Sequence, residues 1–234
     1  QIAKVLRRFY EHTEYVSQSV PQMSYTVPIY YDLHDIMHDA ANREGDFTDL
    51  SSDIAIAVQS SLSLYKKYYD FMDGLDVYYI ALILNPRYKT RLLEQELGED
   101  AILIIRYIKD VLSQQYPSIQ PTILQQSPVH QTLEARLLSK IQGSSVASKS
   151  DIDRYFDDPI AQITEDIAID PNWLFNWWKL RKDEYPCMAA AARDYLAIPA
   201  SEVACERLFS AGRDMIGLRR FSLYADTMRQ LSLL

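Results

Sequence analysis

The chain has 234 residues, of which 48% are hydrophobic and 24% are charged, and its net charge is −8. The apolar fraction excludes a chain that is disordered throughout, and the length is sufficient to bury a sizeable core. The acidic balance excludes a protein that is basic overall and binds nucleic acid by charge alone. Only 6 residues are glycine, so we expect long helices rather than many short strands.

The first half of the chain contains several helix-like patterns. Residues 1–20 predict an amphipathic helix, because apolar residues recur at helical spacing, and Pro21 cannot continue it. A second helix is expected after Pro28, a third over about 52–72 and another over 99–116. The stripe of the last one consists of Ile102, Ile105, Ile108 and Leu112.

The longest apolar run is Val77 to Leu84, with the sequence VYYIALIL. Periodicity does not distinguish a buried strand from a buried helix here, because every face is apolar. A membrane span needs about 20 apolar residues. The run is therefore assigned to the core, and no membrane partner is expected.

A composition shift divides the chain. Residues 129–141 predict a short helix, and 143–150, GSSVASKS, is the clearest linker. Residues 151–170 carry seven acids and one base. We therefore expect a helical region over 1–142, a linker over 143–150 and a distinct C-terminal region over 151–234.

His34 and His38 lie four residues apart and would share one face of a helix. Such a pair could chelate zinc, but a catalytic zinc site needs three protein ligands and no third is marked. A surface pair beside an amphipathic core face is the favoured interpretation, and a metalloenzyme is the alternative.

Known catalytic motifs of hydrolases and nucleotide-binding proteins are missing from the sequence. Cys187 and Cys205 are the only cysteines, so a disulfide scaffold is not expected and reduced thiols are. Cys187 lies between Pro186 and an alanine run. A core position is therefore favoured over a nucleophile.

All three tryptophans of the chain fall within six residues, at Trp173, Trp177 and Trp178. Such a cluster can stack on unpaired bases, and it can equally fill a core or an oligomer interface. Composition favours dimerisation or core packing for these side chains.

Residues 198–217 predict a helix that begins near Ser201 and carries an apolar stripe of Ala204, Leu208, Ala211 and Met215. Glu206 lies almost opposite that stripe. It is either part of a solvated polar face or a carboxylate presented into a cleft, with Arg207 and Arg213 available to contact phosphates.

The C-terminal third resembles the C-terminal dimerisation region of hAT-family transposases. The matching stretches follow in family order: Asp153-Arg154-Tyr155-Phe156, Asp170 to Trp178, Tyr185-Pro186-Cys187-Met188, Ala192 to Ser201, Cys205 to Ser210, Arg219-Arg220 and Thr227 to Leu234. Upstream, Ala81 to Lys89 resembles the family's A-x-x-L-N-P-R-Y-K element.

The resemblance implies a mainly α fold: a helical insertion-like region followed by the C-terminal helices of an RNase H-like transposase domain. Family members cut and join DNA with three carboxylates that hold two Mg²⁺ or Mn²⁺ ions. The third carboxylate corresponds to Glu206. The chain is expected to begin inside the helical insertion, and so to lack the two N-terminal aspartates and the BED-type zinc finger.

The expected function is therefore that of a fragment or remnant of a hAT-like DNA transposase that retains dimerisation. The chain alone is expected to be no enzyme and to need no cofactor. Expected partners are a second copy or more and, only in a complete transposase, DNA. Leu208 and Phe209 join the tryptophans as dimerisation or core candidates, and the nucleus is the expected location. The alternative is a domesticated helical interaction module without a DNA role.

Overall fold

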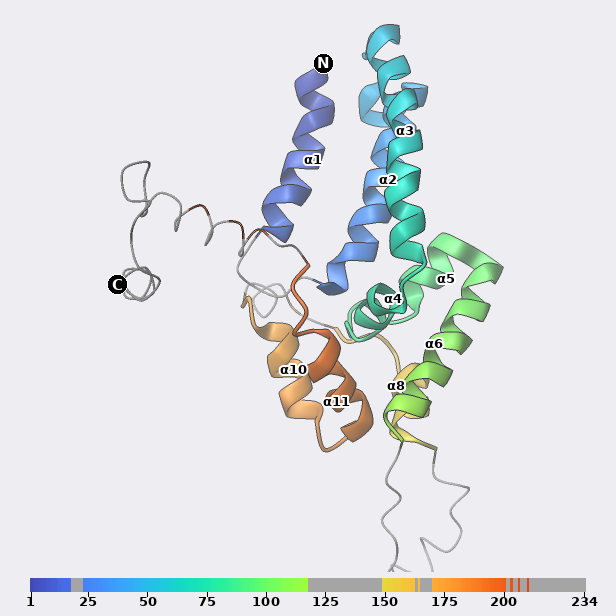
Figure 1. Ribbon diagram of the computed structural model, residues 1–234, viewed down its shortest axis with the longest axis vertical. Helices are drawn as coiled ribbons and strands as arrows, with labels where there is room; N and C mark the ends of the chain where they lie inside the picture. The colour runs from blue at the N-terminus through green and yellow to red at the C-terminus, as the bar shows by residue number, and fades with distance from the viewer. Residues whose placement is uncertain are drawn as a thin grey trace, which may run out of the picture. The chain divides into compact units, whose positions relative to one another are not determined.

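The computed structural model describes residues 1–17, 23–117, 149–162, 164, 170–200, 203, 206 and 210 (Figure 1). The regular elements of that part are helices, and it contains no strand. The prediction of a mainly α fold is therefore confirmed, while its RNase H-like detail stays a prediction. No helix within the described ranges combines the length and apolarity that crossing a membrane requires.

The chain divides into two compact units. The N-terminal unit comprises Gln1–Tyr78, grouped with Leu196–Leu234, and the central unit comprises Tyr79–Tyr195. The central unit thus contains residues from both sides of the expected linker. The predicted boundaries at 142 and 151 remain predictions.

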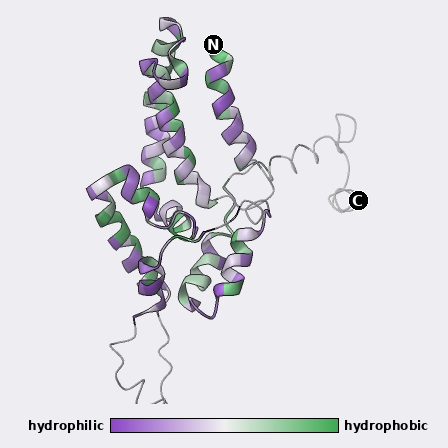
Figure 2. Ribbon diagram, turned by 180° about the vertical axis from the view of Figure 1, so that it is seen from behind, coloured by the Kyte–Doolittle hydropathy of each residue, from purple (hydrophilic) through white to green (hydrophobic). Residues whose placement is uncertain are grey.

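The N-terminal unit is built from three long helices, α1 (Ile2–Val16), α2 (Thr26–Asn42) and α3 (Ser52–Asp73). Figure 1 shows α2 and α3 as an antiparallel pair with α1 beside them. Hydrophilic and hydrophobic residues alternate along these helices, as expected of amphipathic segments (Figure 2).

The predicted limits of these helices are close to the observed ones, with one difference. The second helix begins at Thr26, two residues before Pro28, rather than after it. A proline is tolerated in the first turn because its missing N–H would have no partner there. The helix ends where Arg43 adopts a left-handed conformation with φ of 60°.

One hydrophobic cluster in the core of the N-terminal unit involves α1. Val5, Ala40, Phe47 and Leu50 are buried together, and partly buried side chains pack against them: Phe9, Ile36, Ile54 and Val58. Exposed ion pairs further join α1 to the loops, such as Lys4 with Asp49 at 3.0 Å. Exposed pairs of this kind contribute little to stability.

The central unit begins within α4 (Asp76–Ile83). It continues with further helices, which are α5 (Arg91–Leu97), α6 (Ala101–Gln115), α8 (Asp151–Asp157), α10 (Trp173–Arg181) and α11 (Pro186–Tyr195). Helix α8 packs against α6 and α11, and α10 packs against α11.

The ambiguous apolar run is a helix, α4, and its buried residues are Tyr79, Ile80, Ala81, Leu82 and Ile83. Apolarity on all sides therefore reflects burial on all sides. Helix α5 was not predicted, because its charged sequence RLLEQEL carries little apolar periodicity.

Helix α6 turns the predicted face inward except at Ile102. Ile108 and Leu112 are buried as expected, but Ile102 is 56% exposed and Ala101 is buried instead. Ala101 lies on the same side of the helix as Ile108 and Leu112, at spacings of seven and eleven, whereas Ile102 is turned by about 100° from it. The predicted stripe is wrong at that one position.

The predicted loop after residue 117, the helix over 129–141 and most of the 143–150 linker lie outside the described residues. The last two linker residues, Lys149 and Ser150, lie directly before α8. The Ser150 hydroxyl accepts a hydrogen bond from the backbone N–H of Asp153 at 3.0 Å, and Lys149 pairs with Asp157 at 2.8 Å. Ser150 is thus a typical N-cap.

Candidate functional site

The C-terminal end of α4 lies at the centre of the candidate site. Ile83 and Leu84 are fully buried, and the last carbonyl groups of a helix have no partner within it. The Tyr155 hydroxyl donates to the Ile83 carbonyl at 2.8 Å, and the Trp178 indole N–H donates to the Leu84 carbonyl at 2.9 Å. Side chains from α8 and α10 therefore complete this helix end.

The same side chains form an aromatic cluster. The Tyr155 ring lies 5.1 Å from that of Trp178 and 5.5 Å from that of Tyr185, and the Trp177 and Trp178 rings meet edge to face at 4.8 Å. Edge-to-face pairs add to the energy of apolar burial. Burial raises the pKa of the Tyr155 hydroxyl well above its ordinary value, so this group stays a hydrogen-bond donor.

Lys89 places a buried amine beside this cluster. The residue is 5% exposed, and its Nζ donates to the carbonyl oxygens of Tyr155 and Asp158 at 2.7 and 2.9 Å. Nζ also lies 4.1 Å from the centroid of the Tyr155 ring, a cation–π distance. The backbone of Lys89 has a φ of 46°, which is uncommon for a residue with a side chain.

Burial lowers the pKa of the Lys89 ammonium to about 8; the Asp158 carboxylate opposes this effect and Arg181 adds to it. The amine therefore holds a proton at neutral pH, at an energetic cost that its two carbonyl partners reduce. Its hydrogen bonds end on backbone atoms within and just after α8. We infer a structural role for Lys89, because it fixes the path of the chain where α8 ends.

Asp151 links α8 to the start of α11. One of its carboxylate oxygens accepts hydrogen bonds from the backbone N–H groups of Cys187 and Met188, at 2.8 and 3.2 Å. A carboxylate at a helix N-terminus stabilises the orphan N–H groups and the helix dipole. The other oxygen of Asp151 is buried without a hydrogen-bond partner.

Burial, together with Asp151, raises the pKa of the Cys187 thiol to about 11. The thiolate is the nucleophilic form of cysteine. A thiol that stays protonated at neutral pH supports the interpretation of Cys187 as a packing residue.

The three tryptophans differ in exposure. Trp173 and Trp178 are buried at 6% and 4% exposure, and Trp177 is half-buried. Arg87 lies over the Trp173 ring at 5.8 Å and Arg181 over the Trp177 ring at 5.3 Å. These rings therefore make contacts with other residues of the central unit.

The predicted catalytic and phosphate-contacting residues are placed only in part. Glu206 is helical and exposed. Arg207, Leu208, Phe209 and Arg213 lie outside the described residues.

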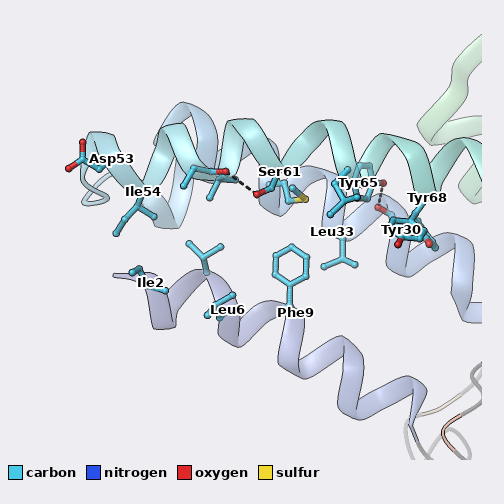
Figure 3. Close-up of a pocket in the computed structure, with 15 residues that line it drawn as sticks. Ile2, Leu6, Phe9, Tyr30, Leu33, Asp53, Ile54, Ser61, Tyr65 and Tyr68 are labelled. Carbon is cyan, nitrogen blue, oxygen red and sulfur yellow. Dashed lines mark hydrogen bonds between the residues drawn. The ribbon is translucent and has the colours of Figure 1, made fainter. Parts of the chain in front are cut away.

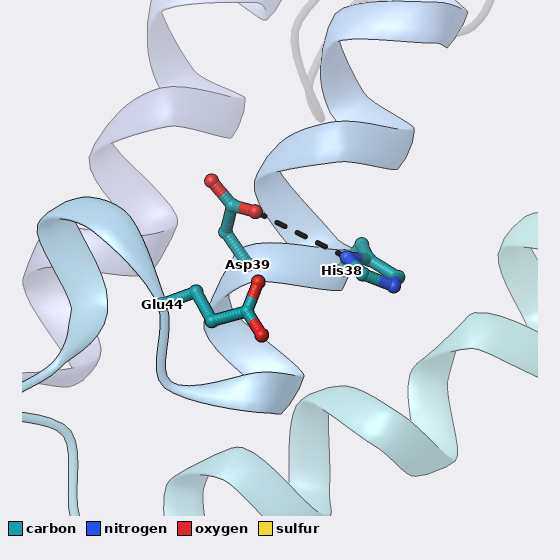
Figure 4. A group of neighbouring side chains, drawn as sticks. All are labelled: His38, Asp39 and Glu44. Atoms are coloured by element: carbon teal, nitrogen blue, oxygen red, sulfur yellow. Dashed lines mark ion pairs between the residues drawn. The ribbon is translucent and has the colours of Figure 1, made fainter.

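The His34 and His38 rings stack with centroids 6.2 Å apart on the exposed side of α2. The potential metal ligands that the described residues bring together are His38, Asp39 and Glu44, with ligand atoms within 4.8 Å of one another (Figure 4). His34 is outside this group and pairs with Asp35 at 3.3 Å. His38 and Glu44 are exposed and Asp39 is half-buried, and exposed acidic groups of this kind are common without a bound ion.

The catalytic metal pair implied by the resemblance does not fit the residues that the structure describes. Glu206 is exposed and does not belong to the group of potential ligands around His38. A divalent metal pair needs several oxygen ligands converging on it.

Sequence reasoning missed Lys89 and the role of Tyr155. Both residues lie in stretches that carry the family resemblance, so the sequence marked these stretches without indicating the role of either side chain. The carbonyl groups that they satisfy belong to other segments of the chain, and no spacing along the sequence shows that.

The comparison with protein families confirms the resemblance. Residues 151–234 match the hAT family C-terminal dimerisation region. Tyr155, Trp178 and Tyr185 of the aromatic cluster belong to this region, whereas Lys89 belongs to the segment before it.

Similar proteins point to the same family. The chain is 25% identical over 161 residues to the zinc finger BED domain-containing protein DAYSLEEPER of Arabidopsis thaliana, covering 65% of this chain and 22% of that protein. It is 27% identical over 180 residues to RICESLEEPER 1 of Oryza sativa subsp. japonica, covering 64% and 24%. It is 25% identical over 174 residues to a putative AC transposase of Zea mays, covering 65% and 21%. The chain thus spans about a quarter or less of each relative.

Proposed function

We propose that this hAT-like, transposase-derived chain associates with further copies of itself through residues 151–234. The observation that carries the proposal is the match of this stretch to the hAT dimerisation region. The central unit supports it physically, because the aromatic cluster and Lys89 give the first part of the region a fixed core. A preformed scaffold lowers the entropic cost of association.

Leu208 and Phe209 are the proposed contact residues of this interface. The buried Trp173 and Trp178 hold the central unit together and are less accessible to a partner. Leu208 belongs to the apolar stripe expected from the sequence, and Phe209 follows it. Aromatic anchors such as Phe209 commonly supply a large share of interface energy.

The test is the mass of the full chain measured by sedimentation at several concentrations. We expect Phe209→Arg to weaken association at least tenfold, and Glu206→Gln, a change at an exposed position, to leave it unchanged. An unaltered mass distribution for Phe209→Arg would contradict the proposed interface. Circular dichroism of both variants reports whether helix content is retained.

We propose further that these 234 residues alone do not cleave DNA. The resemblance assigns them one of three metal-binding carboxylates, Glu206, and one carboxylate cannot hold a metal pair in the geometry that strand cleavage needs. The assay is incubation with Mg²⁺ or Mn²⁺ and DNA bearing terminal repeats. Metal-dependent nicking that Glu206→Gln abolishes would refute this proposal.

Nuclear location is proposed from the same resemblance to transposases and BED zinc finger proteins. Fluorescence microscopy of the tagged chain is the check, with the tag alone as the control. Exclusion of the tagged chain from the nucleus would count against the proposal.

A further inference from the structure

An open apolar groove lies between α1 and the α2–α3 pair of the N-terminal unit (Figure 3). Its volume is about 770 Å³. Ile2, Leu6 and Phe9 face it from α1, and residues of α2 and α3 form the other wall. The lining residues of α3 extend from Asp53 to Tyr68, which corresponds to about 22 Å, or about four helical turns.

The edges of the groove are exposed to solvent. Leu6 of α1 is 59% exposed, and Leu64 and Tyr68 of α3 are 57% and 54% exposed. Small-molecule sites usually enclose most of the surface of their ligand, and a groove with such open edges does not. An open apolar groove of this length is instead the geometry in which proteins bind the apolar face of a helix.

Helix α1 shows how the unit holds a helix through charge as well as apolar contact. Three side chains of α1, spaced four residues apart, meet acids that follow it in the chain, namely Lys4 with Asp49 at 3.0 Å, Arg8 with Asp46 at 3.1 Å and His12 with Asp32 at 2.7 Å. Beside this row, Ile2, Leu6 and Phe9 face the groove. An apolar stripe next to a row of bases therefore suits the acidic surface of this unit.

The N-terminal unit offers more negative charge than α1 neutralises. Residues 1–78 contain 6 bases and 12 acids, so their net charge is −6. Asp53 is the only charged residue among the described residues that line the groove. None of the ion pairs within the described ranges involves Asp53. Charge complementarity therefore favours an occupant that brings a positive group to the Asp53 end.

We propose that the groove binds an amphipathic helix of a partner protein, with apolar residues along one face and Lys or Arg in its last turn. Figure 3 shows Ile2 and Asp53 at the same end of the groove, so α1 and α3 both begin there. A bound helix that runs antiparallel to both places its C-terminal carbonyl groups beside two positive helix N-termini and its basic residues beside Asp53. It completes a four-helix arrangement with α1, α2 and α3.

This surface goes beyond the proposed function, because it lies in residues 1–78 and its occupant is a different protein. The proposed interface of residues 151–234 does not depend on it. Phe209→Arg should therefore weaken self-association without changing binding in the groove.

The probe is a synthetic peptide of about four helical turns, with leucines at i, i+4, i+7 and i+11 and lysines in its last turn. Fluorescence anisotropy of the labelled peptide measures its binding to the full chain. An isolated helix of this length is marginal in water, so circular dichroism should show a gain of helix on binding. A peptide of the same composition with its leucines moved off this spacing is the control. Equal binding of the two peptides would overturn the proposal.

Paired substitutions locate the bound peptide. Leu6→Gln with Leu64→Gln removes an apolar side chain from each wall of the groove, and we expect at least tenfold weaker binding. Leu103→Gln with Leu180→Gln is the matched control, because these leucines of the central unit are 68% and 83% exposed, and should bind as the unaltered chain does. Circular dichroism of each variant alone reports folding. Equal affinities of the two double variants would refute the groove as the site.

A charge reversal tests the orientation. A peptide with glutamates in place of the lysines should bind at least threefold more weakly, the size expected for contacts between exposed charges. Asp53→Lys should reverse this preference, so that the glutamate peptide binds more tightly. Asp183→Lys, a change at an exposed acid of the central unit, is the control and should leave the preference unaltered. A preference for the lysine peptide that persists in Asp53→Lys contradicts the proposed orientation.

The other possible occupant is a second copy of the chain. If Leu6→Gln with Leu64→Gln lowers the mass of the chain in the absence of peptide, the groove serves self-association and the proposed partner is overturned. If Phe209→Arg alone lowers the mass and the lysine peptide binds in the groove, both proposals are supported. A lysine peptide that does not bind the folded chain refutes the groove proposal and leaves the C-terminal one intact.

Discussion

The N-terminal unit and the central unit bury their helices to very different degrees. Helix α3 has 22 residues, of which only Ala55 and Met72 are buried. Helix α4 has 8 residues, and five of them are buried. A helix with one half-buried face leaves the other face to solvent or a partner, whereas a helix buried on all sides is core. The difference indicates that α4 is part of the core of its unit, whereas α3 contributes only part of its surface to the packing of its own.

The two units also use polar groups differently. In the central unit, hydrogen bonds from Lys89, Tyr155 and Trp178 reach backbone carbonyl groups of segments distant in sequence. In the N-terminal unit, connections such as that of Arg8 with Asp46 are exposed ion pairs. Buried hydrogen bonds are costly to leave unmade, while exposed ion pairs contribute little. Mutations in the two units are therefore expected to have unequal effects.

The largest effect is expected at the centre of the aromatic cluster. Trp178→Ala removes a buried indole and leaves the Leu84 carbonyl without its donor, so the free energy of unfolding should fall by about 3–5 kcal/mol. Leu180→Ala is the control on the same helix, since Leu180 is 83% exposed, and should change it by less than about 0.5 kcal/mol. Denaturant titration measures both, and equal losses would contradict the assignment of Trp178 to the core.

The next largest effect is a pH dependence caused by Lys89. Its pKa falls from 10.5 to about 8 on folding, so between these values the unfolded chain binds more protons than the folded one. Stability relative to Lys89→Met should therefore rise with pH from about 8 upwards, by at most about 1.4 kcal/mol per pH unit. Burial raises the pKa of Tyr155, which contacts the amine, well above its ordinary value, and the tyrosines that do not contact position 89 cancel in the difference. A flat difference between the two pH profiles would show that the amine is not buried.

A smaller effect is expected at the start of α11. Asp151→Ala removes the acceptor for the N–H groups of Cys187 and Met188, and should lower the free energy of unfolding by about 1–2 kcal/mol. The control is Asp183→Ala, because Asp183 is an exposed acid between α10 and α11. Thermal unfolding of both variants is the measurement. A loss as large in the control would remove the capping explanation.

The smallest effect is expected in the N-terminal unit. The half-buried Tyr65 donates a hydrogen bond to the Tyr30 carbonyl at 2.7 Å, and Tyr65→Phe should cost about 1 kcal/mol. Tyr68→Phe on the exposed face of the same helix serves as the comparison and should be near neutral. Denaturant titration of both variants is the measurement. A cost well above that of Trp178→Ala would reverse the contrast between the units.

Periodicity predicted the long amphipathic helices well, because one apolar face over many residues leaves a clear pattern. It predicted α3 within a residue, as the spacing of Ile54, Val58 and Tyr65 suggests. It did not predict α5, which is short and charged, and it left α4 ambiguous because a segment buried on every side has no pattern. Tertiary packing decides both cases.

The candidate site was accessible from sequence only in outline. The tryptophan cluster was visible, but the choice between core and interface depended on which groups meet Trp178, and the Leu84 carbonyl lies 94 positions away. Burial of the Lys89 amine is likewise a property of several segments together. The exposure of large apolar residues on α3, such as Leu64 and Phe71, was not foreseen, since an exposed apolar face and a buried one have the same spacing.

The most direct test of the central claim, self-association through residues 151–234, is the sedimentation of the full chain beside Phe209→Arg. We expect the unaltered chain to form a dimer or a larger assembly, and Phe209→Arg to have a lower mass at the same micromolar concentrations. An unaltered chain that is monomeric throughout, or a mass that Phe209→Arg leaves unchanged, would contradict the claim.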